Sequence, residues 1–227
     1  NELKVHNRRL FKMFNKQVEK VTDEQKQLIY TLCKMVEARE DKEGKHLEHV
    51  VSYCKLLAMS LQFSPKFEKR VTASFLDSLL MAAPLHDIGK VYIRDEILLK
   101  PGPLTEEEME IVKTHTELGA EGIREMYEKN PSDSLKMAMD IAKYHHEKWD
   151  GTGYPCGLAG DEIPLSARIL AVVDVYDILT SNRCYRDAYT HEEAIEIMKQ
   201  ESGKSFDPDI IEIFLKIQKR FQKDVSH

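Results

Sequence analysis

The chain has 227 residues, of which 42% are hydrophobic and 32% charged, and its formal net charge is −6. This composition suits one large domain with a substantial core, and the negative balance argues against a nucleic-acid polymer as a partner. No apolar run approaches the roughly 20 residues of a membrane span. The four cysteines form no CxxC pair, which favours reduced thiols and a cytoplasmic protein.

An apolar heptad marks the first 37 residues, which contain neither proline nor glycine. Phe14, Val21, Leu28 and Met35 recur every seven residues. The pattern predicts a long N-terminal helix, which either forms a parallel coiled coil, and so a homodimer, or packs as an amphipathic helix on its own domain. Because the chain begins inside this pattern and without methionine, we interpret it as a fragment. We assign residues 1–37 to a linker or dimerisation helix.

The remaining residues, 38–227, show helical periodicity, helix-start signals and no convincing strand. They therefore predict an all-α domain. A strongly apolar helix is expected to run up to His86 and Asp87, with a bend at Pro84 because proline cannot donate a helical hydrogen bond. A loop is expected over residues 91–104.

Later helices begin at capping signals. Thr105 and Glu108 form a capping box for a helix that carries His115. Another helix ends at His145 and His146, directly before a glycine-rich segment of turn-forming residues. Further helix starts are predicted at Ser132, Pro164, Thr190 and Asp207.

Two aspartates in apolar surroundings require compensation for burial. Asp87 follows His86 at the end of the apolar helix, and Asp174 interrupts another apolar stretch, with Asp177 one turn later on the same face. Burying a carboxylate costs several kcal/mol unless a cation or hydrogen-bond donors compensate it. A metal ion is one interpretation, and a hydrogen-bonded histidine–aspartate pair in the core is the other.

Five histidines and two aspartates qualify as metal ligands: His46, His86, Asp87, His115, His145, His146 and Asp174. This set is too large for one tetrahedral ion and suits two divalent transition metals, namely iron, manganese, nickel or zinc, with iron or manganese favoured. Paired metals support in-line phosphoryl displacement. Lys90, Arg183 and Arg186 supply cations, and the two arginines are spaced to bind phosphate oxygens.

The order of these residues resembles the HD-GYP family, which comprises bacterial cyclic-dinucleotide phosphodiesterases of the HD phosphohydrolase superfamily. The likeness extends from about Glu40 to Phe221. It rests on His86-Asp87-Ile88-Gly89-Lys90, His115, the block from His145 to Pro155 that contains Gly153-Tyr154-Pro155, Asp174 to Asp177, Arg183, Tyr185-Arg186, Gly203 and Phe206-Asp207-Pro208.

The resemblance implies an HD-domain helical bundle that hydrolyses cyclic di-GMP to pGpG, GMP or both. It implies that His86, Asp87, His115, His145, His146 and Asp174 are metal ligands, with Asp87 bridging. We predict catalytic roles for Asp87, Lys90 and Asp177 and substrate contacts for Lys90, Arg183, Arg186 and Tyr154. In such proteins the Gly-Tyr-Pro loop also contacts diguanylate-cyclase domains, and an N-terminal helix links to an upstream sensor or receiver domain and dimerises.

Two departures from the family pattern lie near His46. Members with a third metal have a glutamate four residues earlier, where this chain has Lys42, followed by Glu43, and His49 replaces a common arginine. We therefore expect two metals and no third. Two alternatives stay open: another substrate, such as a mixed cyclic GMP-AMP, and a non-catalytic module that senses cyclic dinucleotides or binds a partner. The filled ligand positions from His86 onward argue against the second alternative.

Overall fold

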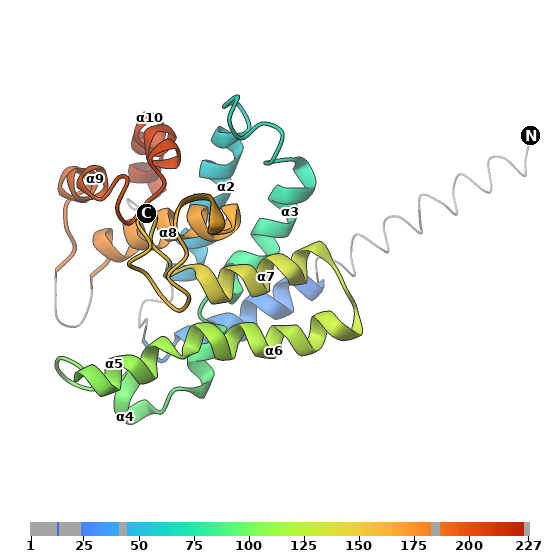
Figure 1. Ribbon diagram of the computed structural model, residues 1–227, viewed down its shortest axis with the longest axis vertical. Coiled ribbons are helices and arrows are strands. Elements are labelled where there is room, and N and C mark those ends of the chain that lie inside the picture. Colours follow the sequence, from blue (N-terminus) through green and yellow to red (C-terminus); the bar gives the residue numbers. More distant parts are fainter. Residues whose placement is uncertain (1–12, 14–23, 41–44, 183–186, 225–227) are drawn as a thin grey trace, which may run out of the picture.

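The computed structural model describes residues 13, 24–40, 45–182 and 187–224, and these residues are helical with two isolated β-bridges (Figure 1). The predicted all-α class is confirmed. In the described part of the chain, no helix is long and apolar enough to span a bilayer. After a helix over residues 24–37, the elements are α2 (His46–Leu61), α3 (Ala73–Ala82), η1 (Ala83–Leu85), η2 (Ile88–Tyr92), α4 (Asp95–Leu98), α5 (Glu106–Lys113), α6 (His115–Lys129), α7 (Asp133–Tyr144), η3 (Gly160–Glu162), α8 (Leu165–Thr180), α9 (His191–Gln200) and α10 (Pro208–Asp224).

Helix α8 lies at the centre of the bundle and packs against α2, α7, α9 and α10 (Figure 1). Aromatic rings fix it to α2 and α10: the Tyr176 ring lies 5.7 Å from Tyr53, 5.4 Å from Phe214 and 5.4 Å from Phe221. Such buried rings contribute large apolar area and specific packing. This packing sets the face of α8 that carries Asp174 and Asp177 against α2.

Local capping chemistry determines where several helices begin. The predicted capping box of Thr105 and Glu108 is present at the start of α5, and Thr190 and Glu193 form a second one at α9. Ser132 accepts a hydrogen bond from a backbone N–H in the first turn of α7. These starts agree with the sequence because a cap depends on residues only three positions apart.

Two boundaries differ from the sequence analysis. The apolar helix ends at Ala82 and continues as η1, so His86 and Asp87 lie beyond it, where Pro84 interrupts α-helical bonding. The helix expected to run from Thr105 through His115 divides at Thr114 into α5 and α6, since the Thr114 hydroxyl and His115 Nδ1 bond to carbonyls of the preceding turn. The predicted loop over residues 91–104 contains α4 and the end of η2.

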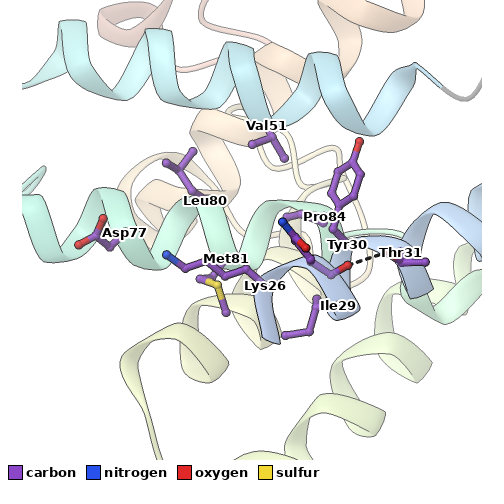
Figure 2. A pocket seen from close by; sticks show the side chains of 10 residues that line it. Lys26, Ile29, Tyr30, Thr31, Val51, Asp77, Leu80, Met81 and Pro84 are labelled. Carbon is purple, nitrogen blue, oxygen red and sulfur yellow. Dashed lines mark hydrogen bonds between the residues drawn. The ribbon is translucent and has the colours of Figure 1, made fainter. Parts of the chain in front are cut away.

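The helix over residues 24–37 packs on its own domain along one side only. Cys33 and Glu37 are buried, whereas Leu28, Leu32 and Met35 are 61%, 51% and 67% exposed. A cavity of about 460 Å³ separates part of this helix from α2 and α3 (Figure 2). Phe14 and Val21 lie outside the described residues, so the coiled coil and the division after residue 37 stay predictions.

Candidate metal centre

A close backbone approach places the His86–Asp87 turn against α6. A Cβ atom at Gly89 would lie 1.9 Å from the carbonyl oxygen of His115 and 2.6 Å from the Gly119 nitrogen. Only glycine permits this contact, because any side chain would overlap backbone atoms. As a result, Asp87 Oδ1 lies 3.2 Å from His115 Nε2.

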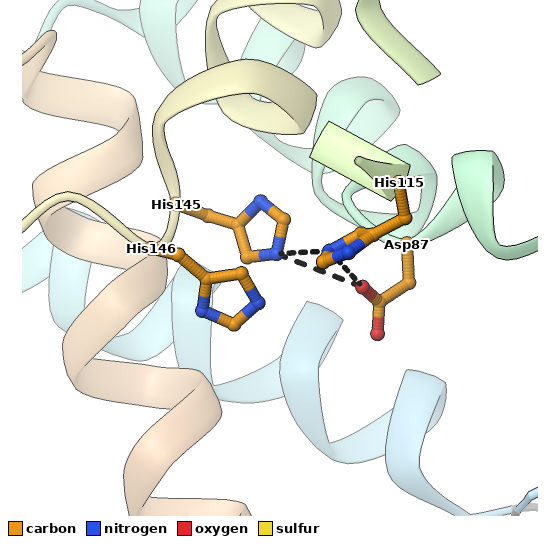
Figure 3. Close-up of side chains that lie close together, drawn as sticks. All are labelled: Asp87, His115, His145 and His146. Carbon is orange, nitrogen blue, oxygen red and sulfur yellow. Dashed lines mark hydrogen bonds and ion pairs between the residues drawn. The ribbon is translucent and has the colours of Figure 1, made fainter. Parts of the chain in front are cut away.

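Four side chains converge in what we call the Asp87 cluster, which comprises Asp87, His115, His145 and His146 (Figure 3). One ligand atom from each lies within 4.8 Å of those of the others. Helix α7 ends at Tyr144, so the two adjacent histidines follow its last turn and both reach the cluster. This resolves the difficulty that neighbouring side chains inside a helix diverge by about 100°.

A second group, the Glu37 cluster, comprises Glu37, His46 and His86, whose ligand atoms also lie within 4.8 Å of one another. His46 Nε2 is 3.4 Å from Asp174 Oδ1. Asp87 lies between the two clusters, because its Oδ1 faces His115 while its Oδ2 is 3.3 Å from His86 Nε2. The seven predicted ligands therefore lie in one region, and Glu37 joins them.

Four of the five imidazoles share one orientation. The Nδ1 atoms of His86, His115 and His145 lie 2.9, 2.6 and 3.0 Å from backbone carbonyl oxygens of their own turns, and His46 Nδ1 lies 2.6 Å from a carboxylate oxygen of Asp177. With Nδ1–H donated outward, each ring presents Nε2 to the interior. Outward bonds of this kind orient metal-binding histidines in known sites.

The inward-facing atoms lack the hydrogen-bond donors that burial requires. Glu37 Oε1, His86 Nε2 and Asp87 Oδ1 are buried without a hydrogen-bond partner among the described residues. A neutral His115 whose Nδ1–H is donated to Val112 presents a lone pair to Asp87 Oδ1, 3.2 Å away. Two acceptors at this separation repel, so a proton or a metal cation must lie between them. The residues fit divalent metal ions.

Charges around Asp87 keep this carboxyl ionised. Lys90 Nζ lies 2.9 Å from Asp87 Oδ2 and 3.0 Å from Glu40 Oε1. Burial opposes ionisation, but the charges of Lys90 and His86 hold the pKa of Asp87 well below its usual value. Burial and the neighbouring His145 lower the pKa of His146 strongly. An ionised aspartate and a neutral imidazole are the forms that bind metals.

The protonation of His86 differs from that of His146. Burial favours the neutral imidazole, but the nearby charges of Asp87, Asp174 and Glu37 together raise the pKa of His86 to about 10. A proton therefore occupies this ring when no metal is bound. A metal at Nε2 would replace that proton, since ligand imidazoles must be neutral.

A family model described as an HD domain matches residues 30–210. The chain belongs to the HD domain family. A cyclic di-GMP phosphodiesterase of Vibrio cholerae is 42% identical over 88% of this HD domain chain and 41% of its own length. A 3'3'-cGAMP-specific phosphodiesterase of the same organism is 40% identical, over 84% of the chain and 34% of the relative. The HD domain chain thus spans less than half the length of these relatives.

Solved structures share the fold of this HD domain. A crystal structure of a cyclic GMP-AMP-specific phosphodiesterase of V. cholerae aligns with a TM-score of 0.57 at 20% identity, covering 88% of this chain and 51% of that one. An HDG"Y"P protein from Bdellovibrio bacteriovorus aligns with a TM-score of 0.55 at 19% identity, covering 76% and 52%. The resemblance to HD-GYP proteins drawn from the motifs is confirmed.

Asp177 lies behind the ligands of this HD domain. It is fully buried, and its two oxygens lie 2.6 Å from His46 Nδ1 and 2.6 Å from His49 Nδ1. A carboxylate that holds the outer nitrogen of a ligand histidine fixes its tautomer and ring orientation. We therefore interpret Asp177, for which the sequence predicted a catalytic role, as a residue that positions His46.

The Gly-Tyr-Pro loop folds back onto the Asp87 cluster. Glu147 accepts hydrogen bonds from the backbone N–H groups of Cys156 and Leu158, at 2.7 and 3.1 Å. A Cβ atom at Gly153 would lie 2.3 Å from the Lys148 nitrogen, so glycine is required there. The loop stacks the Tyr154 ring on His146, with centroids 4.8 Å apart and planes inclined at 29°.

Two acidic residues that the structure places at the site, Glu37 and Glu40, were not named from the sequence. Glu37 lies four residues after Cys33, on the same face of the helix, and Cys33 is buried. A glutamate on an apolar helix face is a signal that could have indicated it. Arg183 and Arg186, two of the predicted phosphate contacts, lie outside the described residues. Lys42 and Glu43, on which the expectation about a third metal rests, lie outside them as well.

Proposed function

We propose that this HD domain is a metal-dependent phosphodiesterase for cyclic dinucleotides, with cyclic di-GMP as the preferred substrate and pGpG, GMP or both as products. The observation that carries the proposal is the position of Asp87, whose two oxygens face different ligand clusters. Such an arrangement suits two ions that share one carboxylate, and paired ions are typical of phosphodiester hydrolysis. The names of the V. cholerae relatives support the substrate class.

The Asp87 cluster would hold one ion, and His46, His86 and Asp174 would hold the other together with Asp87. Imidazoles mixed with carboxylates suit iron or manganese. When bound, such ions polarise phosphoryl oxygens and lower the pKa of water. The protein orients the imidazoles through their Nδ1–H groups and keeps Asp87 ionised.

Lys90 serves two purposes in this proposal. Its ammonium group contacts Asp87 Oδ2 and both carboxylate oxygens of Glu40. In this proposal Lys90 would exchange one of its Glu40 contacts for a substrate phosphate beside the metal site. Arg183 and Arg186 follow the end of α8 in sequence and remain the proposed ligands of the other phosphate oxygens.

Tyr154 would contact substrate at the edge of its ring. One face of the ring is stacked on His146, and Lys113 Nζ lies 5.4 Å from the ring centroid. The surrounding loop is the proposed surface for a diguanylate-cyclase domain. In a longer protein, residues 1–37 would connect an upstream sensor domain and dimerise through the exposed row of Leu28, Leu32 and Met35.

The test compares hydrolysis of cyclic di-GMP, 3'3'-cGAMP and cyclic di-AMP by the purified chain loaded with Mn²⁺ or Fe²⁺. We expect linear dinucleotide or mononucleotide products by chromatography, and no products from Asp87→Asn or after chelation. Hydrolysis of 3'3'-cGAMP alone would establish the alternative substrate. A metal-loaded chain that binds a cyclic dinucleotide without hydrolysing any would establish the non-catalytic alternative.

A further inference from the structure

Glu37 is the last residue of the helix over residues 24–37, and it enters the metal centre from a segment that none of the HD-GYP-like motifs includes. Its side chain is 9% exposed, and one of its carboxylate oxygens lies within 4.8 Å of ligand nitrogens of His46 and His86. This helix, which contacts α2 through the Lys34–Glu48 ion pair, thus brings a carboxylate to His46 and His86.

The Glu37 carboxyl has no hydrogen-bond donor at its buried oxygen. Oε1 is unpartnered among the described residues, and so is the facing His86 Nε2. The ammonium group of Lys90 is bonded to Glu40 and Asp87. The remaining positive neighbours of Glu37 are the imidazoles of His86 and His46, which carry charge only while they are protonated. A metal ion bound to the neutral rings would compensate the buried carboxylate in their place.

We infer that Glu37 is a metal ligand, which completes with His46 and His86 a site for a divalent first-row ion such as Mn²⁺ or Fe²⁺. Two imidazoles and one carboxylate on one side of an ion are a known ligand set for such metals. Asp174, 3.4 Å from His46 Nε2, borders the same site. The inference rests on the metal-dependent function proposed above, and it assigns a ligand that this function does not require.

Ligation by Glu37 connects the metal centre to the helix that leaves the domain. The other side of this helix exposes Leu28, Leu32 and Met35. A rotation of the helix by one residue position, about 100°, would withdraw the carboxylate from the site. Metal occupancy at the Glu37 cluster therefore depends on the position of the helix over residues 24–37.

In the metal-free protein, the burial of Glu37 should lower the free energy of unfolding. The buried oxygen Oε1 has no hydrogen-bond partner among the described residues, and burying an unpartnered carboxyl oxygen is unfavourable. Replacing Glu37 with a neutral isostere should therefore leave the melting temperature of the metal-free protein unchanged or higher. This separates a metal ligand from a carboxyl that stabilises the fold through its own contacts.

The experiment compares Glu37→Gln with Glu48→Gln, using Mn²⁺ as the probe. Glu48 is a matched control because it lies on α2 and forms a 3.1 Å ion pair with Lys34 of the helix over residues 24–37. It belongs to neither the Asp87 cluster nor the Glu37 cluster. Equilibrium dialysis with elemental analysis, calorimetric titration and melting curves with and without Mn²⁺ are measured on the full chain. We expect Glu37→Gln to lower the affinity of one of two ions at least about tenfold, and Glu48→Gln to match the wild type.

Equal Mn²⁺ affinity and stoichiometry in Glu37→Gln and the wild type would overturn the inference. If Glu37→Gln fails to fold, Glu37→Asp retains the charge and withdraws the oxygen by one methylene; weaker Mn²⁺ binding supports ligation, and unchanged binding refutes it. A wild-type chain that binds Mn²⁺ and hydrolyses substrate while Glu37→Gln does the same leaves the proposed function intact. A wild-type chain that neither binds Mn²⁺ nor hydrolyses substrate overturns both.

Discussion

His49 Nδ1 lies 2.6 Å from Asp177 Oδ1, on the carboxylate whose other oxygen contacts the proposed ligand His46. A titratable imidazole thus stands at the position where the resemblance to HD-GYP proteins leads us to expect an arginine. The hydrogen bond to Asp177 raises the pKa of His49 above its ordinary 6.5, against opposing effects of burial, His46 and Lys45. Hydrogen bonds to His46 and His49 lower the pKa of Asp177, although burial opposes this shift.

The His49–Asp177 pair predicts a loss of stability at alkaline pH. Because the pKa of His49 is raised in the folded protein, its contribution to the free energy of unfolding is complete below pH 6.5. This contribution is lost as the pH rises through the folded pKa. The contribution of Asp177 is present above its ordinary 3.8 and is lost only as pH falls through its lowered pKa. His49→Arg keeps its charge, so its melting temperature should decline less between pH 6 and 9 than that of the wild type.

Between pH 6 and 9 the wild type should lose about 1.5–3 kcal/mol more stability than His49→Arg, the range for a hydrogen bond to a charged group. This corresponds to a few degrees in melting temperature. His49→Gln serves as the control, since it is neutral throughout and should be less stable than the wild type at pH 6. If His49→Arg declines as steeply as the wild type, another group is responsible for the alkaline loss.

Tyr154 should affect metal binding through His146. Unlike the other four imidazoles, His146 has no outward hydrogen bond to a carbonyl or carboxylate among the described residues, and the Tyr154 ring stacks on it instead. Tyr154→Ala should lower Mn²⁺ affinity at the Asp87 cluster about tenfold, as loss of an orienting contact does in other metal sites. Tyr154→Phe keeps the ring and should bind Mn²⁺ normally.

Calorimetric Mn²⁺ titration distinguishes this role from a direct substrate contact. Normal Mn²⁺ binding by Tyr154→Ala, combined with a raised KM for cyclic di-GMP, would assign the tyrosine to substrate alone. A substrate effect in both variants, with metal affinity reduced only in Tyr154→Ala, would assign the hydroxyl to substrate and the ring to His146.

Arg168 should be important for stability rather than for metal binding. Its Nη1 atom lies 2.8 Å from Asp207 Oδ2 and 2.8 Å from Asp161 Oδ1, and the guanidinium lies 5.5 Å from the Trp149 ring. Arg168 and Asp207 are both buried. Arg168→Met leaves a buried carboxylate unpaired, which should cost about 3–5 kcal/mol in urea unfolding.

The double variant Arg168→Met/Asp207→Asn tests whether the unpaired charge causes that loss. It should recover part of the stability, since the amide does not carry the charge left behind. An additive loss in the double variant would assign the effect to packing of the arginine stem instead. Mn²⁺ affinity of the folded single variant should equal that of the wild type.

Features that depend on neighbouring residues in the sequence could be predicted. The starts of α5 and α9 follow from capping boxes whose members are three residues apart. The end of α7 at Tyr144, just before His145 and His146, follows from the turn-forming residues beyond it. The all-α class follows from periodicity in the same way. The seven candidate ligands could also be named in advance, because histidine and aspartate are the residue types that bind such metals and several of them stand in apolar stretches or at predicted helix ends.

Features that depend on contacts between distant segments could not be predicted from the sequence. Glu37 and His86 come from segments that are far apart in the sequence, and no local pattern specifies their proximity. The hydrogen bonds of Asp177 join α8 to α2 across 131 and 128 residues of chain. The end of α3 at Ala82 was not predicted either, because Pro84 is compatible with a bend, as expected from the sequence, and with the break that is observed.

Gly89 should be intolerant of any side chain, and Gly122 in the same contact region offers the matched control. A Cβ atom at Gly89 would overlap His115 backbone atoms at 1.9 Å, whereas one at Gly122 would meet only the Tyr92 hydroxyl at 3.6 Å. Gly89→Ala must therefore separate the Asp87 turn from α6. We expect a loss of about 1–3 kcal/mol in urea unfolding and weaker Mn²⁺ binding, because Asp87 and His115 move apart.

Gly122→Ala, inside α6, should gain up to about 1 kcal/mol from helix propensity and bind Mn²⁺ normally. Wild-type stability and Mn²⁺ affinity in Gly89→Ala would show that the close approach of the turn to α6 does not build the metal centre.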